Sequence, residues 1–317
     1  MDKNEKARNA VDAYRLRKLG DVMITRAYAY DDAPKLLDLA SADADALLRA
    51  YKGKLENFDT APFDVDGHQI KFYEGGYTVW SGYPGNGKTT ILRQMVCHLL
   101  ARGKGVFAAH LEEDPGDSLI RTAGVAFGTP LPTVNQLQWF LDFYADAFRV
   151  WGIIGLCPHR ELFGTIQELA STGIKHFVID SLMCLDLKSD DYEAQRVFAN
   201  GLSALVRNHK IHVHLVAHPR KIQSTDTEPD LNDIAGSADI GRLADNVLFV
   251  RRGEKGNSAT QDLTPMQVLI KKQRYEPSFH GSISGWFNKR IRQFTKDQWQ
   301  QAPTQYLPKS AYEDGQS

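Results

Sequence analysis

The chain has 317 residues, 42% of them hydrophobic, with 38 basic and 39 acidic side chains and a formal net charge of −1. This near-neutral balance excludes a global attraction to nucleic acid or to a membrane surface, so any such binding must come from a local patch or from a surface formed on assembly. No apolar run approaches the ~20 residues of a membrane-spanning helix, and the N-terminus is too charged for a secretory signal. The cysteines, Cys97, Cys157 and Cys184, lack zinc-site spacing and fit small buried side chains in a reducing compartment. We therefore expect a soluble, cytoplasmic protein without a membrane contact.

Residues 1–60 are rich in alanine, leucine and charged residues, and their apolar side chains recur at helical spacing. They are too few to form a core alone, so this segment is expected to be a helical linker or oligomerisation segment. It packs either on the main domain or on a neighbouring subunit. A linker is expected at 57–62. The main domain is expected at 61–296, followed by a C-terminal tail at 297–317.

The stretch 76–90 reads GYTVWSGYPGNGKTT and satisfies the P-loop (Walker A) pattern G-x-x-x-x-G-K-[ST]. An apolar strand, a glycine-rich turn and a helical pattern follow one another, which is the context that this motif requires. The glycines let successive N–H groups face one anion, and the N-terminus of the helix adds to that field. Lys88 is then expected to reach the β- and γ-phosphates of ATP, and the Thr89 hydroxyl to hold Mg²⁺. The candidate nucleotide-binding residues are Gly82, Pro84, Gly85, Asn86, Gly87, Lys88, Thr89 and Thr90.

From residue 63 onward, strand patterns alternate with helical patterns. The expected strands are 105–111, 150–157, 176–182, 211–218, 246–251 and 266–272. The expected helices are 114–127, 134–148, 162–171 and 191–209. This alternation predicts an α/β fold with a mostly parallel sheet flanked by helices, and ligands gather at the carboxyl ends of such strands.

Carboxylates end two of these strands. Asp180 ends the strand HFVID, where P-loop ATPases place a second Mg²⁺ ligand, and the alternative is an ordinary aspartate that caps the next turn. Glu112 and Glu113 end the strand after the P-loop helix, where a carboxylate can orient and deprotonate the attacking water. The alternative is a pair of acids at a helix N-terminus. We favour Glu112 as the base and keep Glu113 in reserve.

Two later stretches are candidates for function. His218 ends a strand and opens a polar loop at 219–237, and a loop of this length inside a compact domain is usually functional or disordered. The histidine could sense the γ-phosphate. The sequence KKQR at 271–274 ends a late strand and is either an arginine finger that acts in trans or a solvated basic strand end.

In order along the chain, the motifs GYPGNGKTT, HLEED, HFVIDS, VAHPRK, GSADIGRLADN and KKQR resemble the RecA-like motor domain of DnaB-type hexameric replicative helicases. Within that group they are most similar to phage primase–helicases and to the Twinkle helicases. The resemblance covers about 63–294. The P-loop alone is unspecific, whereas AHPRK followed by the spaced GS and ADN is much more specific.

The resemblance implies a ring, a hexamer in this family, that moves 5′–3′ on single-stranded DNA and unwinds duplex DNA in phage or prokaryotic replication, using ATP and Mg²⁺. It implies that Glu112 is the catalytic base, that Asp180 coordinates magnesium and that His218 senses phosphate. Arg274 is implied as the arginine finger, with Lys272 beside it, and both serve the ATP of the adjacent subunit.

The loop at 219–237 matches the family's DNA-binding loop. The implied DNA-binding residues are Arg220, Lys221, Gly236, Ser237 and Ala238. The loop is acidic between Asp226 and Asp233, so we expect backbone N–H groups at 236–238 to carry part of the binding. No primase or zinc-binding region is expected at the N-terminus, which leaves a separate primase as a partner.

Two other functions remain open at this point. One is a RecA/RadA-like recombination ATPase, which would form filaments on single-stranded DNA instead of a closed ring. The other is a regulatory ATPase of the same fold, in which the long loop contacts a protein.

Overall fold

The computed structural model describes residues 43–65, 67–220, 228–253, 262–275, 280–300 and 302–314. Within them the chain forms a nine-stranded sheet in the order β11-β10-β9-β8-β3-β7-β6-β4-β5 and a separate two-stranded sheet, β1-β2. The α/β fold with a mostly parallel sheet is therefore confirmed. Among the described residues, no helix combines the length and the apolar character that crossing a bilayer requires.

Six neighbouring strands of the large sheet run parallel. They are β3 (Gly76–Ser81), β4 (Gly105–His110), β5 (Phe148–Val150), β6 (Ile174–Asp180), β7 (His212–Val216) and β8 (Asn246–Arg252). Every residue of β3 and β7 is buried, as expected for central strands covered on both faces. Antiparallel strands extend the sheet beyond β8: β9 (Leu263–Gln273), β10 (Gly281–Asn288) and β11 (Gln293–Thr295).

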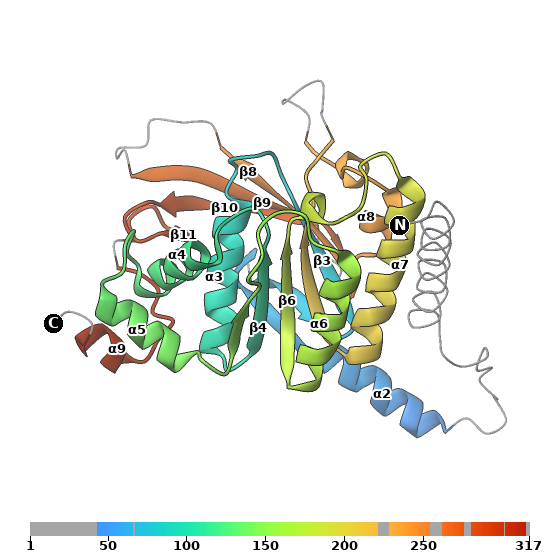
Figure 1. Cartoon of the computed structure of the whole chain (residues 1–317), viewed down its shortest axis with the longest axis horizontal. Coiled ribbons are helices and arrows are strands. Elements are labelled where there is room, and N and C mark those ends of the chain that lie inside the picture. Colours follow the sequence, from blue (N-terminus) through green and yellow to red (C-terminus); the bar gives the residue numbers. More distant parts are fainter. Residues whose placement is uncertain are drawn as a thin grey trace, which may run out of the picture.

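Helices cover both faces of the sheet (Figure 1) and form two hydrophobic cores. One face carries α3 (Lys88–Ala101), α4 (Pro115–Phe127), α5 (Val134–Phe143) and α9 (Lys309–Asp314). The other carries α6 (His159–Ser171), α7 (Tyr192–His209) and α8 (Ala238–Leu243). Two short 3₁₀ turns are η1 (Leu182–Cys184), which follows β6, and η2 (Leu231–Asp233), which precedes α8.

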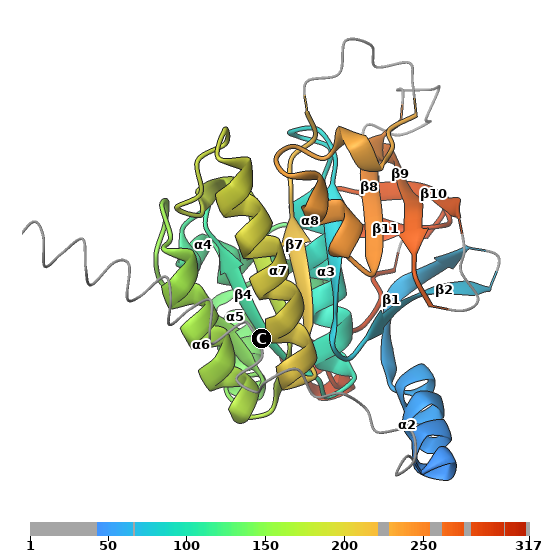
Figure 2. The same cartoon turned by 90° about the vertical axis from the view of Figure 1, so that its right-hand side faces the viewer.

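The start of the described chain differs from the sequence prediction. Helix α2 (Ala44–Glu56) projects from the body (Figure 2) and leads directly into β1 (Phe58–Val65), which pairs with β2 (His68–Tyr73). The linker predicted at 57–62 is therefore wrong, because Ala61 and Phe63 of this strand are buried in the core on the α3 side. Residues 1–42 of the predicted helical segment lie outside the described residues.

The C-terminal part also departs from the prediction. The helix expected at 134–148 ends at Phe143, and the strand expected at 150–157 is the short β5, which ends at Val150. Strands β10 and β11 were not predicted. Of the expected tail at 297–317, the described part packs onto the domain: Tyr306 and Leu307 are buried, and Tyr144 donates a hydrogen bond to the Tyr306 carbonyl at 2.6 Å.

Candidate nucleotide-binding site

The P-loop connects β3 to α3 at the carboxyl edge of the parallel strands. Its glycines Gly82, Gly85 and Gly87 have φ angles of 140°, 79° and 89°, a region that other residues rarely adopt. Gly82 is also crowded, since a Cβ atom there would lie 2.3 Å from the Val250 carbonyl oxygen of β8. The loop can therefore pass so close to β8 only with glycine at this position.

Lys88 is the first residue of α3, and it folds back over the loop. Its Nζ donates hydrogen bonds to the carbonyl oxygens of Gly82, at 2.6 Å, and Tyr83, at 3.2 Å. Burial lowers the pKa of Lys88, whereas the negative charges of Asp180 and Glu112 oppose this change. The ammonium thus lies at the mouth of the P-loop, where an incoming phosphate can replace the carbonyl contacts.

A hydroxyl and a carboxylate meet beside this lysine. Thr89 Oγ1 donates a 2.7 Å hydrogen bond to Asp180 Oδ2, which joins the start of α3 to the end of β6. Burial by itself raises the pKa of Asp180. The hydrogen bond and charge of His110, together with the hydrogen bond from Thr89, outweigh burial and lower this pKa. An anionic oxygen next to a hydroxyl oxygen fits Mg²⁺, which uses one or two carboxylates together with substrate phosphates.

The adjacent glutamates Glu112 and Glu113 have different surroundings. The side chain of Glu112 is 51% exposed, and its Oε1 accepts from the Ser181 hydroxyl and lies 3.4 Å from His218 Nε2. The side chain of Glu113 is only 15% exposed. It pairs with Arg93 and, at 3.1 Å, with Arg121. Both glutamates line the pocket, but Glu113 is engaged in ion pairs, whereas the carboxylate of Glu112 is the more exposed of the two.

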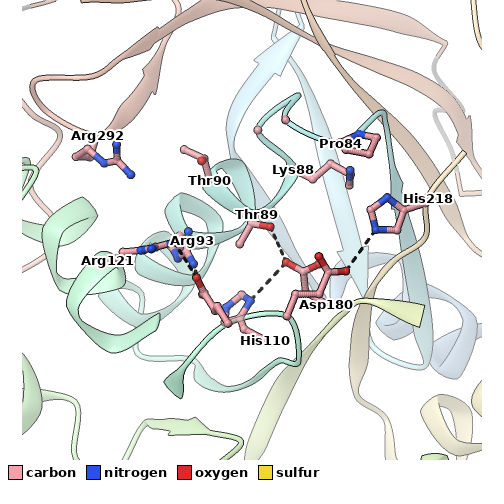
Figure 3. A pocket seen from close by; sticks show the side chains of 14 residues that line it. Pro84, Lys88, Thr89, Thr90, Arg93, His110, Arg121, Asp180, His218 and Arg292 are labelled. Atoms are coloured by element: carbon pink, nitrogen blue, oxygen red, sulfur yellow. Dashed lines mark hydrogen bonds and ion pairs between the residues drawn. The ribbon is translucent and has the colours of Figure 1, made fainter. Parts of the chain in front are cut away.

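These groups line one pocket of about 440 Å³ (Figure 3). Lys88 and His218 lie on one side of it, and Arg121 and Arg292 lie on the opposite side, with Thr89 and Thr90 between them. The volume and the basic and polar lining of the pocket therefore fit a phosphorylated ligand.

Sequence reasoning missed four residues of this pocket: Arg93, His110, Arg121 and Arg292. His110 is the last residue of β4, two positions before Glu112, so its place at a strand end could have indicated it. Arg292 carried no local signal, because the turn between β10 and β11 brings it to the pocket from about 200 residues beyond the P-loop. It has a φ of 58° and no carboxylate partner within the described chain. Burial, with the charges of Arg93 and Arg121, lowers its pKa.

The polar loop after β7 is closed at its base by its own contacts. Arg220 donates from Nε to the Ile234 carbonyl, at 3.1 Å, and from Nη2 to the Gly236 carbonyl, at 2.9 Å. The Ser237 N–H donates to Gln195 Oε1 at 2.7 Å, and the Ser237 side chain caps α8. Arg220 and the Ser237 N–H are therefore engaged within the chain, and the assignment of Arg220 and residues 236–238 to DNA binding stays a prediction.

The other residues of the predicted DNA site differ in their surroundings. Gly236 has a φ of 93°, and a Cβ atom there would lie 2.2 Å from Gln195 Oε1, so this glycine is required by packing within the chain. Ala238 is exposed at the first turn of α8. Lys221 and the rest of 221–227 lie outside the described residues.

Lys272 and Arg274 lie outside the pocket. Gln273 of β9 pairs with Asn246, the first residue of β8, so Arg274 lies at the edge of the sheet opposite the P-loop. Five residue steps along β3, from Tyr77 to Gly82, separate the two edges by on the order of 15 Å. Arg274 therefore cannot serve the P-loop of its own subunit without a large rearrangement.

Comparisons with known proteins find one family model, a curated relative and solved structures that are similar to parts of this chain. Residues 159–296 match the model of the family described as the DnaB-like helicase C terminal domain. A Twinkle homolog protein, chloroplastic/mitochondrial, from Arabidopsis thaliana is 31% identical over 107 residues, which is 32% of this chain and 15% of that protein. The match thus spans a small part of the length of this curated relative.

Two solved structures share the fold. One is described as an ATPase domain, and it superposes with a TM-score of 0.64 at 16% identity, covering 80% of this chain and 98% of that one. A DnaB-like replicative helicase, studied with its interactions with primase, gives a TM-score of 0.64 at 15% identity over 91% of this chain and 74% of that one. The fold is therefore that of RecA-like helicase ATPase domains, and the resemblance to DnaB-like helicases is confirmed.

Proposed function

We propose that this chain, whose residues 159–296 match the DnaB-like helicase C-terminal domain family, is the ATP-driven motor of a ring-forming replicative DNA helicase. One observation carries the proposal: a single pocket gathers Lys88, the Thr89–Asp180 pair and the Glu112–His218 pair. This is the set of charges that nucleoside triphosphate hydrolysis needs, namely a cation and N–H groups for phosphate, oxygen ligands for a metal, and an accessible base.

In the proposed mechanism the N–H groups of the P-loop and the start of α3 bind the phosphates. Lys88 exchanges its carbonyl contacts for phosphate oxygens. Thr89 and Asp180 hold Mg²⁺, which supplies charge neutralisation for the transferring phosphoryl group. Glu112 accepts the proton of the attacking water, since its carboxylate faces the pocket, and His218 lies where the departure of the γ-phosphate changes its surroundings.

Lys272 and Arg274 complete the site from the adjacent subunit. Their place at the edge opposite the P-loop supports action in trans, because a head-to-tail arrangement of subunits can bring these two edges together. Such an arrangement forms a ring where its rotation closes. We propose a hexamer.

The proposed substrate is single-stranded DNA, bound by the 219–237 loop and moved 5′–3′ during duplex unwinding. Because Arg220 and the Ser237 N–H are engaged within the chain, we assign the phosphate contacts chiefly to Lys221 and its neighbours in this loop. A separate primase is the proposed partner in phage or prokaryotic replication, by analogy with the solved helicase studied with primase.

The deciding experiment measures ATP hydrolysis with and without single-stranded DNA, alongside the mass of the assembly with a non-hydrolysable nucleotide and the unwinding of a forked duplex. A helicase motor shows DNA-stimulated hydrolysis, a closed ring and unwinding. Open filaments with strand pairing would support the recombination ATPase, and hydrolysis indifferent to DNA would support the regulatory ATPase.

A further inference from the structure

The short helix α8 joins two regions that the proposed function treats separately. Its N-cap, Ser237, ends the proposed DNA loop, and the Ser237 N–H is bonded to Gln195 of α7. Its C-terminal end lies against Lys272 and Arg274, at the end of β9. One helical segment of six residues therefore separates the loop from the basic pair.

The carbonyl groups near the end of α8 are held by side chains. The Tyr77 hydroxyl donates to the Ile240 carbonyl at 2.8 Å. Lys272 Nζ donates to the carbonyls of Gly241 and Arg242 at 3.2 and 2.7 Å. These donors satisfy carbonyls that have no partner inside the helix, and the two cations are favoured at the negative end of the helix. A displacement of α8 must therefore move the basic pair or break these bonds.

Asp245, just beyond α8, holds the arginine of this pair. Its side chain is only 3% exposed, and its two oxygens have different partners. Oδ2 accepts from the Tyr77 N–H at 3.1 Å, and Oδ1 lies 3.3 Å from Arg274 Nη1. Arg274 also donates from Nη2 to the Arg242 carbonyl at 3.3 Å. Arg274 is thus fixed between a buried carboxylate and the end of α8.

We infer that Asp245 is a positioning residue, which holds Arg274 beside Lys272 at the end of α8 so that the DNA loop of one subunit sets the placement of the finger at the ATP of the next. The inference rests on the proposed function, since it assumes that Arg274 acts in trans. It adds a physical link between DNA binding and hydrolysis, through contacts that run along α8 from Ser237 to Arg242.

The decisive variant is Asp245→Asn. An asparagine offers one oxygen and one NH₂ group, so one of the two donors that face Asp245, the Tyr77 N–H or the Arg274 guanidinium, must meet another donor. Loss of the ion pair with Arg274 should lower kcat by about 10- to 100-fold at saturating ATP, with KM changed less than about threefold, because the subunit's own pocket is intact. Asp239→Asn is the matched control, since it removes one negative charge from the neighbouring helix α8.

Subunit mixing separates this role from a general structural one. We expect Asp245→Asn subunits, mixed with Lys88→Ala subunits, to regain DNA-stimulated hydrolysis, because an intact P-loop then meets an intact finger. Asp245→Asn subunits mixed with Arg274→Ala subunits should regain no hydrolysis, since both substitutions impair the arginine finger and no interface then has an intact one. If Asp245→Asn fails to assemble, Tyr77→Phe keeps the side-chain volume and removes only the bond to the Ile240 carbonyl. It should show the same pattern of rescue with a smaller loss.

The outcomes distinguish the inference from the proposed function. Absence of rescue between Arg274→Ala and Lys88→Ala, in mixtures shown to co-assemble, removes the trans finger and the inference with it. Rescue in that mixture, but not with Asp245→Asn, overturns the inference alone. A rise in KM for Asp245→Asn with unchanged kcat overturns it as well.

Discussion

The charged groups at the two edges of the parallel sheet differ in how firmly their partners hold them. At the carboxyl edge, Lys88 and Asp180 line an open pocket of about 440 Å³, and their present partners are groups that a nucleotide and a metal can replace. At the opposite edge, Arg274 is held by Asp245 and the end of α8. The first edge is arranged to receive a ligand, and the second holds a cation in a fixed place. Under the proposed function, a complete hydrolytic site uses both edges, which two subunits supply.

The largest expected effect concerns the first edge. Lys88→Ala should abolish hydrolysis and weaken nucleotide binding, because this ammonium contacts the P-loop carbonyls and lies where the phosphates bind. Turnover and nucleotide affinity measure this directly, with the exposed Lys309→Ala as control. Near-normal turnover in Lys88→Ala would remove the P-loop assignment.

Removal of the cation at the second edge should come next. Arg274→Ala should fold, assemble and bind ATP, yet hydrolyse it about 10³- to 10⁵-fold more slowly, the usual effect of losing an arginine finger. Single-turnover kinetics with a parallel measurement of ATP affinity would show whether only the chemical step is lost. An unchanged rate would leave Arg274 as a structural partner of Asp245.

The two glutamates allow a sharper test within the first edge. Glu112→Gln should retain nucleotide binding and lose about 10²- to 10⁴-fold in rate, as expected for a general base. Glu113→Gln should lose less than about tenfold, because its carboxylate is engaged by Arg93 and Arg121 and supports them. The reverse order would identify Glu113 as the base.

The smallest expected effect is at the far end of the pocket. Arg292→Ala should raise the KM for ATP by about tenfold with little change in kcat, since this guanidinium lies across the pocket from Lys88 and His218 and can add only binding energy. Arg290→Ala, in the same turn but outside the pocket, is the matched control. A fall in kcat at constant KM would place Arg292 at the reacting phosphate instead.

The sequence predicted those parts of the site that depend on local chain order. A strand, a glycine turn and a helix place Lys88 and Thr89, and a strand end places Asp180, because parallel strands end at one edge. Choosing Glu112 or Glu113 as the candidate base depends on the directions of their side chains, which a sequence pattern does not contain.

The remaining differences have physical causes that act over long distances. Arg292 reaches the pocket only because antiparallel strands extend the sheet beyond β8. Asp59 of β1 is held by His176 and Lys104, which lie far along the chain. The contacts of Arg220 and Gly236 likewise depend on the packing of the loop on α7. The sequence shows that these residues are polar or small, but it does not show which residues they contact.

Mixing Lys88→Ala and Arg274→Ala subunits shows whether two subunits share one hydrolytic site. The measurement is ATP hydrolysis on single-stranded DNA. Each variant alone should be inactive, whereas in an equal, randomly assembled mixture about a quarter of the head-to-tail interfaces pair an intact P-loop with an intact finger. We expect a clear gain of activity that peaks near equal amounts. A co-assembled mixture that stays as inactive as its components would contradict it.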